Sequence, residues 1–180
     1  MQTELIIISG PTASGKSKLA VILAEKISAE IVSADSRQIY KFMDIGAAKP
    51  SPEDIMRVPH HMIDIITPDT VYSAGEYKNE ARKIIDEILN KKKKVIMAGG
   101  TGLYMRAVLY DISTYSSRDD KIRKELEKII EEKGSEYLYE QLKQVDPDTA
   151  KKIHFNDKVR LIRALEIHKL TGLSASSLRT

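Results

Sequence analysis

The feature that most constrains the fold is an octapeptide near the N-terminus with the pattern G-x-x-x-x-G-K-S. Its residues are Gly10, Pro11, Thr12, Ala13, Ser14, Gly15, Lys16 and Ser17. An apolar run at residues 5–9 precedes it, and apolar residues at helical spacing follow it up to Ile27. A Walker A phosphate loop has this pattern in this position, between a buried strand and the start of a helix. The sequence therefore predicts a strand, a phosphate loop and a helix in succession.

The residue types in this loop indicate the class of ligand. Gly10 and Gly15 allow the backbone to curl so that successive N–H groups point inward at a helix N-terminus, where they bind an anion. Lys16 adds a positive charge for the outer phosphates, and the hydroxyl of Ser17 can coordinate Mg²⁺. A tight turn alone would leave Lys16 and Ser17 unexplained. We therefore expect a bound di- or triphosphate with Mg²⁺ as cofactor.

The composition is typical of a globular protein, with 42% hydrophobic and 31% charged residues. No apolar stretch has the length of a membrane span, so we expect no membrane partner. The absence of cysteine excludes disulfides, thiolate metal sites and a cysteine nucleophile, and it suits a cytoplasmic location. The net charge of +3 permits a nucleic-acid partner without arguing for one.

The pattern of elements predicts an α/β fold. Strand-like apolar runs occur at residues 5–9, 31–34, 62–66 and 95–98, and helical patterns at 16–28 and about 75–90. Alternating strands and helices with continuously apolar strands favour a parallel sheet flanked by helices, as in P-loop (nucleoside-triphosphate-hydrolase-like) proteins. The prolines between residues 49 and 68 predict a loop excursion there.

After about residue 112 the pattern is entirely helical. Ser117 and Asp120 resemble a capping box, Asp146-Pro147 resembles a helix start, and a last helix runs from Asn156 or Asp157 to about Leu170. We predict three parts: a P-loop α/β core at 1–112, a small all-helical inserted module at 113–145, and helices at 146–180 that return to the core.

Polar residues follow two of the predicted strands. The run 95–98 ends in Gly99-Gly100-Thr101-Gly102 without a carboxylate, whereas the run 31–34 is followed by Asp35. Ligands collect at the carboxyl ends of parallel strands, so we expect Asp35 near the phosphate loop, as a base or as a metal ligand through water. A simple turn-capping role is the alternative for Asp35. Ser36, Arg37 and Gln38 suggest a polar binding edge, in which Gln38 could pair with adenine.

Other candidates leave alternatives open. Adjacent His60 and His61 point to opposite faces of a strand, so they do not favour a shared metal. Asp64 could be a metal-side carboxylate, which keeps a P-loop kinase of a small hydroxyl or nucleotide substrate as an alternative function. Arg160 and Arg163 need anionic partners, either a protein carboxylate or a phosphate.

Taken together, these segments resemble the tRNA dimethylallyltransferase family, also called the tRNA isopentenyltransferase family. The matching segments are GPTASGKS (10–17), SADSRQIY (33–40), DIGAAKP (44–50), PHHMID (59–64), YSAGEY (72–77), GGTGLY (99–104) and NDKVRLIRALE (156–166). They occur in family order across essentially the whole chain. The segment Gly46-Ala47-Ala48-Lys49 carries Ala where a small hydroxyl residue is usual in the family.

The resemblance implies transfer of a dimethylallyl group from dimethylallyl diphosphate to N6 of an adenosine next to the anticodon of a tRNA. It implies catalytic roles for Asp35, Thr101 and Lys16, diphosphate binding by residues 10–17, and Mg²⁺ on Ser17. It also implies contacts of the helical module and of further residues with the tRNA anticodon stem-loop. The implied tRNA-contacting residues are Asp35, Ser36, Arg37, Gln38, Thr101, Arg123, Val159, Arg160, Leu161, Ile162 and Arg163.

Family members continue beyond the length of this chain, with a C-terminal part that completes the core and grips the tRNA. The resemblance therefore implies a truncated or shortened member, which we expect to be a monomer. Prenylation of free adenine nucleotides is a related possibility within the family. A diphosphate- or tRNA-binding fragment without turnover is the alternative outside the enzymes.

Overall fold

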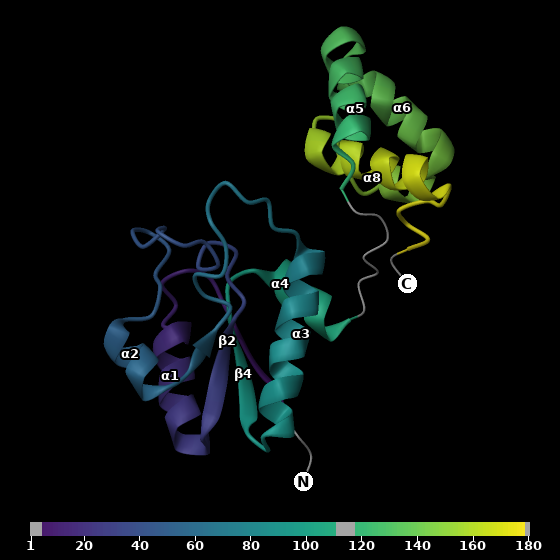
Figure 1. Cartoon of the computed structure of the whole chain (residues 1–180). Helices are drawn as coiled ribbons and strands as arrows, with labels where there is room; N and C mark the ends of the chain where they lie inside the picture. Colours follow the sequence, from purple (N-terminus) through teal and green to yellow (C-terminus); the bar gives the residue numbers. More distant parts are fainter. Residues whose placement is uncertain (1–4, 111–117, 179–180) are drawn as a thin grey trace. The chain divides into compact units, whose positions relative to one another are not determined.

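The computed structural model describes residues 5–110 and 118–178 (Figure 1). The chain divides into two compact units, residues 1–111 and 112–180. The predicted boundary between residues 112 and 113 lies outside the described residues. No helix in the described ranges is long and apolar enough to cross a membrane.

The first unit is a parallel sheet with helices on both faces. Strands β1 (Leu5–Ser9), β2 (Ala29–Ser33), β3 (His60–His61) and β4 (Lys94–Gly99) lie in the order β1-β4-β2-β3. Helices α1 (Lys16–Ile27) and α3 (Ala74–Asn90) have nearly the predicted bounds and lie on opposite sides of the sheet (Figure 1). The predicted α/β class with a parallel sheet is confirmed.

Side chains that alternate in direction along the strands explain why both faces of the sheet are covered by helices. Ile31 and Ile96 pack with α1, whereas their neighbours Val32 and Met97 pack with α3 and with α4 (Gly102–Leu109). Side chains of a strand alternate between faces, so apolar residues at every position require helices on both sides. Burying each of these side chains contributes about 1.5–3 kcal/mol relative to exposure.

The predicted strand at residues 62–66 is wrong. The strand in this part of the chain is β3, which comprises His60 and His61 and pairs with Ile31 and Val32. Met62 and Asp64 have left-handed backbone conformations, with φ of 61° and 55°, which are incompatible with an extended strand. The predicted loop at 49–68 contains the short helix α2 (Pro52–Arg57), which Ser51 caps.

The second unit is all-helical. It contains α5 (Asp120–Lys133), α6 (Ser135–Val145), α7 (Pro147–Ala150) and α8 (Lys158–Thr171). Ser117 lies outside the described residues, and Asp119 caps α5 by accepting from Lys121 and Ile122 N–H. Asp146 and Asp157 cap α7 and α8, as predicted.

The helices of this unit share one apolar core. Leu126 of α5, Leu142 of α6 and Leu161 of α8 are fully buried in one shared core. Residues 146–178 therefore lie in the same compact unit as α5 and α6. The reason is the apolar character of α8 on most sides, which α5 and α6 bury.

Candidate active site

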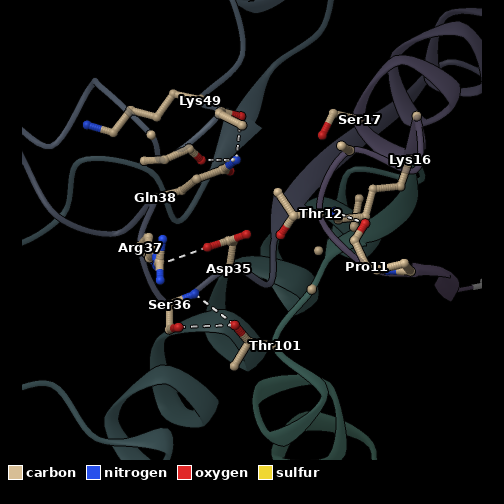
Figure 2. Close-up of a pocket in the computed structure, with 18 of the residues that line it drawn as sticks. Pro11, Thr12, Lys16, Ser17, Asp35, Ser36, Arg37, Gln38, Lys49 and Thr101 are labelled. Atoms are coloured by element: carbon tan, nitrogen blue, oxygen red, sulfur yellow. Dashed lines mark hydrogen bonds between the residues drawn. The ribbon is translucent and has the colours of Figure 1, made fainter.

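The phosphate loop has the strand–loop–helix geometry that its sequence predicts. Gly15 has a φ of 81° at the N-terminus of α1, a left-handed conformation that favours glycine. Lys16 folds back over the loop, and its Nζ donates to the carbonyl of Pro11 at 3.0 Å (Figure 2). The loop thus presents the N-terminus of a twelve-residue helix together with an exposed ammonium group, which suits an anion.

The glycine at the end of β4 brings the neighbouring strand ends close together. A Cβ on Gly99 would lie 2.1 Å from the carbonyl oxygen of Ala34, so only glycine fits there. Thr101 N–H donates to that same oxygen at 3.0 Å. The Thr101 hydroxyl oxygen accepts from Ser36 N–H at 2.9 Å and donates to the Ser36 hydroxyl at 3.2 Å. Thr101 therefore links the segment after β4 to the segment after β2.

Asp35 faces the same space as the phosphate loop. A Cβ built on Gly100 would lie 4.0 Å from Asp35 Oδ2, 4.0 Å from Lys16 Cε and 3.6 Å from the carbonyl oxygen of Gly10. The other oxygen, Oδ1, accepts from Arg37 N–H at 2.9 Å. Asp35 thus forms the turn that the alternative interpretation anticipated, and its second oxygen points toward the loop (Figure 2).

Gln38 does not have the arrangement that the sequence interpretation gave it. The side chain is buried, its Oε1 accepts from the Ser33 hydroxyl at 2.8 Å, and its Nε2 donates to the carbonyls of Ala47 and Ala48 at 3.2 and 2.8 Å. These bonds engage both ends of the amide, so pairing of Gln38 with adenine is not supported. Gln38 instead holds the loop that contains Ala47 and Ala48.

Lys49 holds the same loop through three further hydrogen bonds. Its Nζ donates to Asp44 Oδ1 at 2.7 Å, to Asp64 Oδ1 at 2.6 Å and to the Tyr40 carbonyl at 2.9 Å. Burial would lower the pKa of Lys49, but the hydrogen bonds to the two carboxylates raise it above its usual range. Asp64 is thus an ion-pair partner rather than a metal-side carboxylate, which removes the sequence argument for a kinase.

These segments enclose one cavity of about 780 Å³. The cavity is lined by Pro11–Ala13, Gly15–Lys18, Asp35–Gln38, Gly46–Lys49 and Ala98–Thr101. Of the first-unit residues to which the family resemblance gives a catalytic, diphosphate-binding or tRNA-contacting role, all except Gly10 and Ser14 are on this lining. Asp64 and the two histidines are absent from it: His60 Nδ1 bonds the Val58 carbonyl, and His61 Nε2 bonds Glu30.

A buried tyrosine pair behind the cavity was missed by the sequence interpretation. The rings of Tyr77 and Tyr104 stack with centroids 4.0 Å apart, and the Tyr77 hydroxyl donates to the Ser33 carbonyl at 2.8 Å. Burial, together with the charges of Tyr40 and Asp35, raises the pKa of Tyr104 to about 12. Both tyrosines lie inside segments that match the family, and the helical pattern at about 75–90 includes Tyr77 on its apolar face, but no pattern indicated that the two rings stack.

The remaining predicted RNA-contacting residues lie in the second unit. Val159 and Arg160 are well exposed, and Arg160 pairs with Asp157. Leu161 is fully buried and Ile162 nearly so, because they face the core shared with α5 and α6; the side chain of Leu161 is therefore unavailable for RNA contact. The open question about the partner of Arg163 is answered by a protein carboxylate, Glu166, which also binds Arg123.

Comparison with known proteins identifies relatives of the whole chain. The model of the family described as IPP transferase matches residues 38–180. The tRNA dimethylallyltransferase 2 of Geotalea uraniireducens is 51% identical over 177 residues, which are 98% of this chain and 57% of that protein. The tRNA dimethylallyltransferase of Geobacter sulfurreducens is 49% identical over 171 residues, which are 95% of this chain and 55% of that protein.

Solved structures agree with these relatives. The full-length tRNA isopentenylpyrophosphate transferase of Bacillus halodurans has a TM-score of 0.62 and 42% identity, covering 97% of this chain and 57% of that chain. A eukaryotic dimethylallyltransferase, described as acting on tRNA, has a TM-score of 0.82 and 29% identity, covering 98% and 44%. The chain thus spans about half the length of the relatives it matches. On sequence, fold and motif order, the chain belongs to the IPP transferase family.

Proposed function

We propose that this chain transfers a dimethylallyl group from dimethylallyl diphosphate to N6 of an adenosine next to the anticodon of a tRNA. The observation that carries the proposal is the shared cavity, in which a phosphate loop and the carboxylate of Asp35 face each other across Gly100. The names of the relatives, tRNA dimethylallyltransferase, supply the substrate class.

The phosphate loop would bind the diphosphate of the donor. The loop amides at the N-terminus of α1 and the ammonium group of Lys16 stabilise the negative charge that develops as the allylic C–O bond breaks. Lys16 would exchange its bond to the Pro11 carbonyl for the diphosphate oxygens. This reaction needs no carboxylate that supports ATP hydrolysis, which agrees with the observation that β4 ends in a glycine, Gly99.

The chemistry of the donor set fits Mg²⁺. Ser17 supplies a hydroxyl in the cavity, and the described residues contain no cluster of three or more carboxylates, histidines or cysteines that would form a closed metal site. Mg²⁺ is commonly held by one or two protein oxygens plus phosphate oxygens. Bound there through Ser17, it would supply positive charge to the leaving diphosphate.

Asp35 would accept the proton from the nucleophile. The N6 lone pair of the adenine forms the new C–N bond at C1 of the dimethylallyl group, the C–O bond breaks, and inorganic pyrophosphate leaves. The proton lost by N6 passes to the Asp35 carboxylate. To reach the cavity, the adenine must leave the stacked bases of the RNA. Thr101 would keep this geometry by holding the segment that begins at Asp35.

The tRNA anticodon stem-loop is the proposed partner, and a monomer is the proposed state. Ser36, Arg37 and Thr101 support RNA contact from the cavity, and Arg123, Val159, Arg160 and Arg163 support it from the helical unit. No specific observation favours the kinase alternative.

The test is transfer of labelled dimethylallyl from its diphosphate to an unmodified tRNA anticodon stem-loop. Asp35→Asn should lower the transfer rate by about 100- to 10,000-fold, the usual contribution of a general base. It should leave binding of inorganic pyrophosphate unchanged. Asp86→Asn, which alters an exposed carboxyl group on α3, is the matched control and should transfer at the wild-type rate.

Equal rates for Asp35→Asn and the wild type would remove Asp35 from the mechanism. Pyrophosphate binding without any transfer by the wild type would identify a binding protein without turnover. Phosphorylated product made from ATP, without prenylated RNA, would instead establish the kinase alternative.

A further inference from the structure

The helical unit contains a completely buried carboxylate to which the active-site chemistry gives no role. Glu166 on α8 is 0% exposed and accepts hydrogen bonds from three residues. Arg123 donates through Nε at 2.8 Å and through Nη2 at 3.0 Å, Arg163 donates through Nη1 at 2.7 Å, and Asp119 donates through its backbone N–H at 2.9 Å. Four bonds use the full accepting capacity of a carboxylate.

The two arginines carry more charge than the carboxylate neutralises. Among the hydrogen-bonded side chains, two guanidinium groups and one carboxylate leave a net charge of +1, and the carboxylates of Asp120 and Glu127 also act on Arg123. The side chains of Arg123 and Arg163 remain 25% and 36% exposed, so both extend from the buried carboxylate to solvent. Without Glu166 the two cations would repel each other, and each long side chain would sample many rotamers.

The arrangement with Arg123 is a planar fork, since its Nε and Nη2 donate to different oxygens of the same carboxylate. This geometry fixes the plane of the guanidinium group and leaves the Nη1 donors outside the fork. Arg123 also lines a groove of about 260 Å³ in the helical unit, together with Lys158, Val159 and Ile162. Glu127 and Glu131 line the same groove, so its charge is mixed.

We propose that Glu166 is a positioning residue for RNA binding, which holds Arg123 and Arg163 in a fixed arrangement for adjacent RNA phosphates. The proposal rests on the proposed function, because that function supplies the RNA. Arginine binds phosphate through paired N–H donors, so the orientation of its guanidinium plane decides the strength of the contact. Fixing both side chains in the free protein lowers the entropy that binding would otherwise cost.

A purely structural role for Glu166 predicts that Glu166→Gln changes RNA affinity in the opposite direction from a positioning role. Glu166→Gln raises the net charge by one, which by itself tightens binding to any RNA. If Glu166 served only to join α5 to α8, the folded variant would bind RNA as well as the wild type, or better. If Glu166 orients the arginines, the variant binds a structured RNA more weakly despite its added positive charge.

The experiment measures the affinity of the full chain for an unmodified anticodon stem-loop by fluorescence anisotropy over a series of KCl concentrations. Glu166→Gln should weaken binding about tenfold. The slope of the logarithm of the binding constant against the logarithm of the salt concentration should decrease by the amount that corresponds to one to two lost phosphate contacts. Glu125→Gln is the matched control. It makes the same charge change at an exposed position of α5, where Glu125 pairs with Lys169. It should bind as the wild type or slightly more tightly.

Arg123→Lys provides a second test that does not depend on the buried carboxyl group. It keeps the charge but cannot form the fork, and it should also weaken stem-loop binding. The inference is overturned if Glu166→Gln binds like Glu125→Gln, or, should Glu166→Gln not fold, if Arg123→Lys binds like the wild type. A wild type that binds no stem-loop would instead contradict the RNA part of the proposed function.

Discussion

Gly99, the last residue of β4, and Gly100, the residue after it, allow the same glycine-to-alanine change to be tested in a crowded and in an open environment. In Gly99→Ala the new methyl group would lie 2.1 Å from the carbonyl oxygen of Ala34 and 2.3 Å from its carbonyl carbon. Both are backbone atoms, so the strands must separate until the contact reaches at least 3.4 Å. That movement disturbs the bonds of Ala34 to Ala98 (2.8 Å) and Thr101 (3.0 Å).

The expected cost of Gly99→Ala follows from these contacts. Overpacking costs about 1–3 kcal/mol, and each weakened backbone hydrogen bond adds about 0.5–1.5 kcal/mol. With two such bonds disturbed, we therefore expect a loss of roughly 2–6 kcal/mol from the unfolding free energy of the α/β unit, a large fraction of the about 5–15 kcal/mol typical of a domain.

Gly100→Ala should behave differently, because its Cβ would meet nothing closer than 3.6 Å. The fold should keep its stability within about 1 kcal/mol, whereas the methyl group would occupy the space between Asp35 and Lys16 and reduce pyrophosphate binding and transfer. Urea denaturation followed by circular dichroism measures the first effect, and calorimetric titration with pyrophosphate measures the second. Equal denaturation midpoints for Gly99→Ala and the wild type would refute the packing argument.

Lys49→Met removes three hydrogen bonds and leaves Asp44 and Asp64 without their cation, so the unfolding free energy should fall by about 1–3 kcal/mol and pyrophosphate binding should weaken. Unchanged melting and binding would show that the loop at 44–49 does not depend on this ion pair. Inorganic pyrophosphate with Mg²⁺ should stabilise the wild type by about 2.7 kcal/mol at a hundred times its dissociation constant. Chelation of Mg²⁺ or Ser17→Ala should reduce this gain, and equal melting shifts with and without Mg²⁺ would exclude Ser17 as a metal ligand. Burial alone would raise the pKa of Glu166, but hydrogen bonds from Arg123 and Arg163 lower it to about 2, from an ordinary value of 4.5. Because the folded pKa is depressed, this contribution of about 3 kcal/mol is present above pH 4.5 and is lost as the pH falls toward 2. Melting temperatures at about pH 6 and about pH 2.5 should therefore differ less for Glu166→Gln than for the wild type; an identical difference would contradict the assignment.

The sequence predicted the elements whose signals are local. The phosphate loop, α1 and α3 have strong short-range patterns, and the caps at Asp146 and Asp157 were found at their predicted positions. The wrong strand at 62–66 has a different origin. Its residues have high strand propensity, but Met62 and Asp64 take left-handed conformations, and Lys49 holds Asp64 from a loop fifteen residues earlier. Propensity is overridden there by a contact that no local window contains.

The same distinction explains which site residues could be predicted. Strand order and direction bring the carboxyl ends of β2 and β4 to one edge of the sheet. Because ligands bind at the carboxyl ends of parallel strands, this general rule was enough to predict Asp35 beside the phosphate loop. Whether a polar side chain is free for a ligand depends instead on its partners. Gln38 and Arg163 were both candidates for RNA contact, yet the amide of Gln38 is engaged at both ends by protein, whereas Arg163 shares Glu166 with Arg123 and remains partly exposed.

This difference has a consequence for mutagenesis of the two residues. Replacing Gln38 should change the cavity indirectly, through release of Ala47 and Ala48, and the effect should appear in protein stability as well as in binding. Replacing Arg163 should act on RNA affinity and its salt dependence more than on pyrophosphate binding, because Arg163 belongs to the helical unit. Gln38→Ala and Arg163→Ala, compared in a melting experiment and in both binding assays, should therefore show separable losses. A loss of pyrophosphate affinity in Arg163→Ala equal to that in Gln38→Ala would contradict the proposal that the α/β unit binds pyrophosphate and that Arg163 of the helical unit contacts RNA.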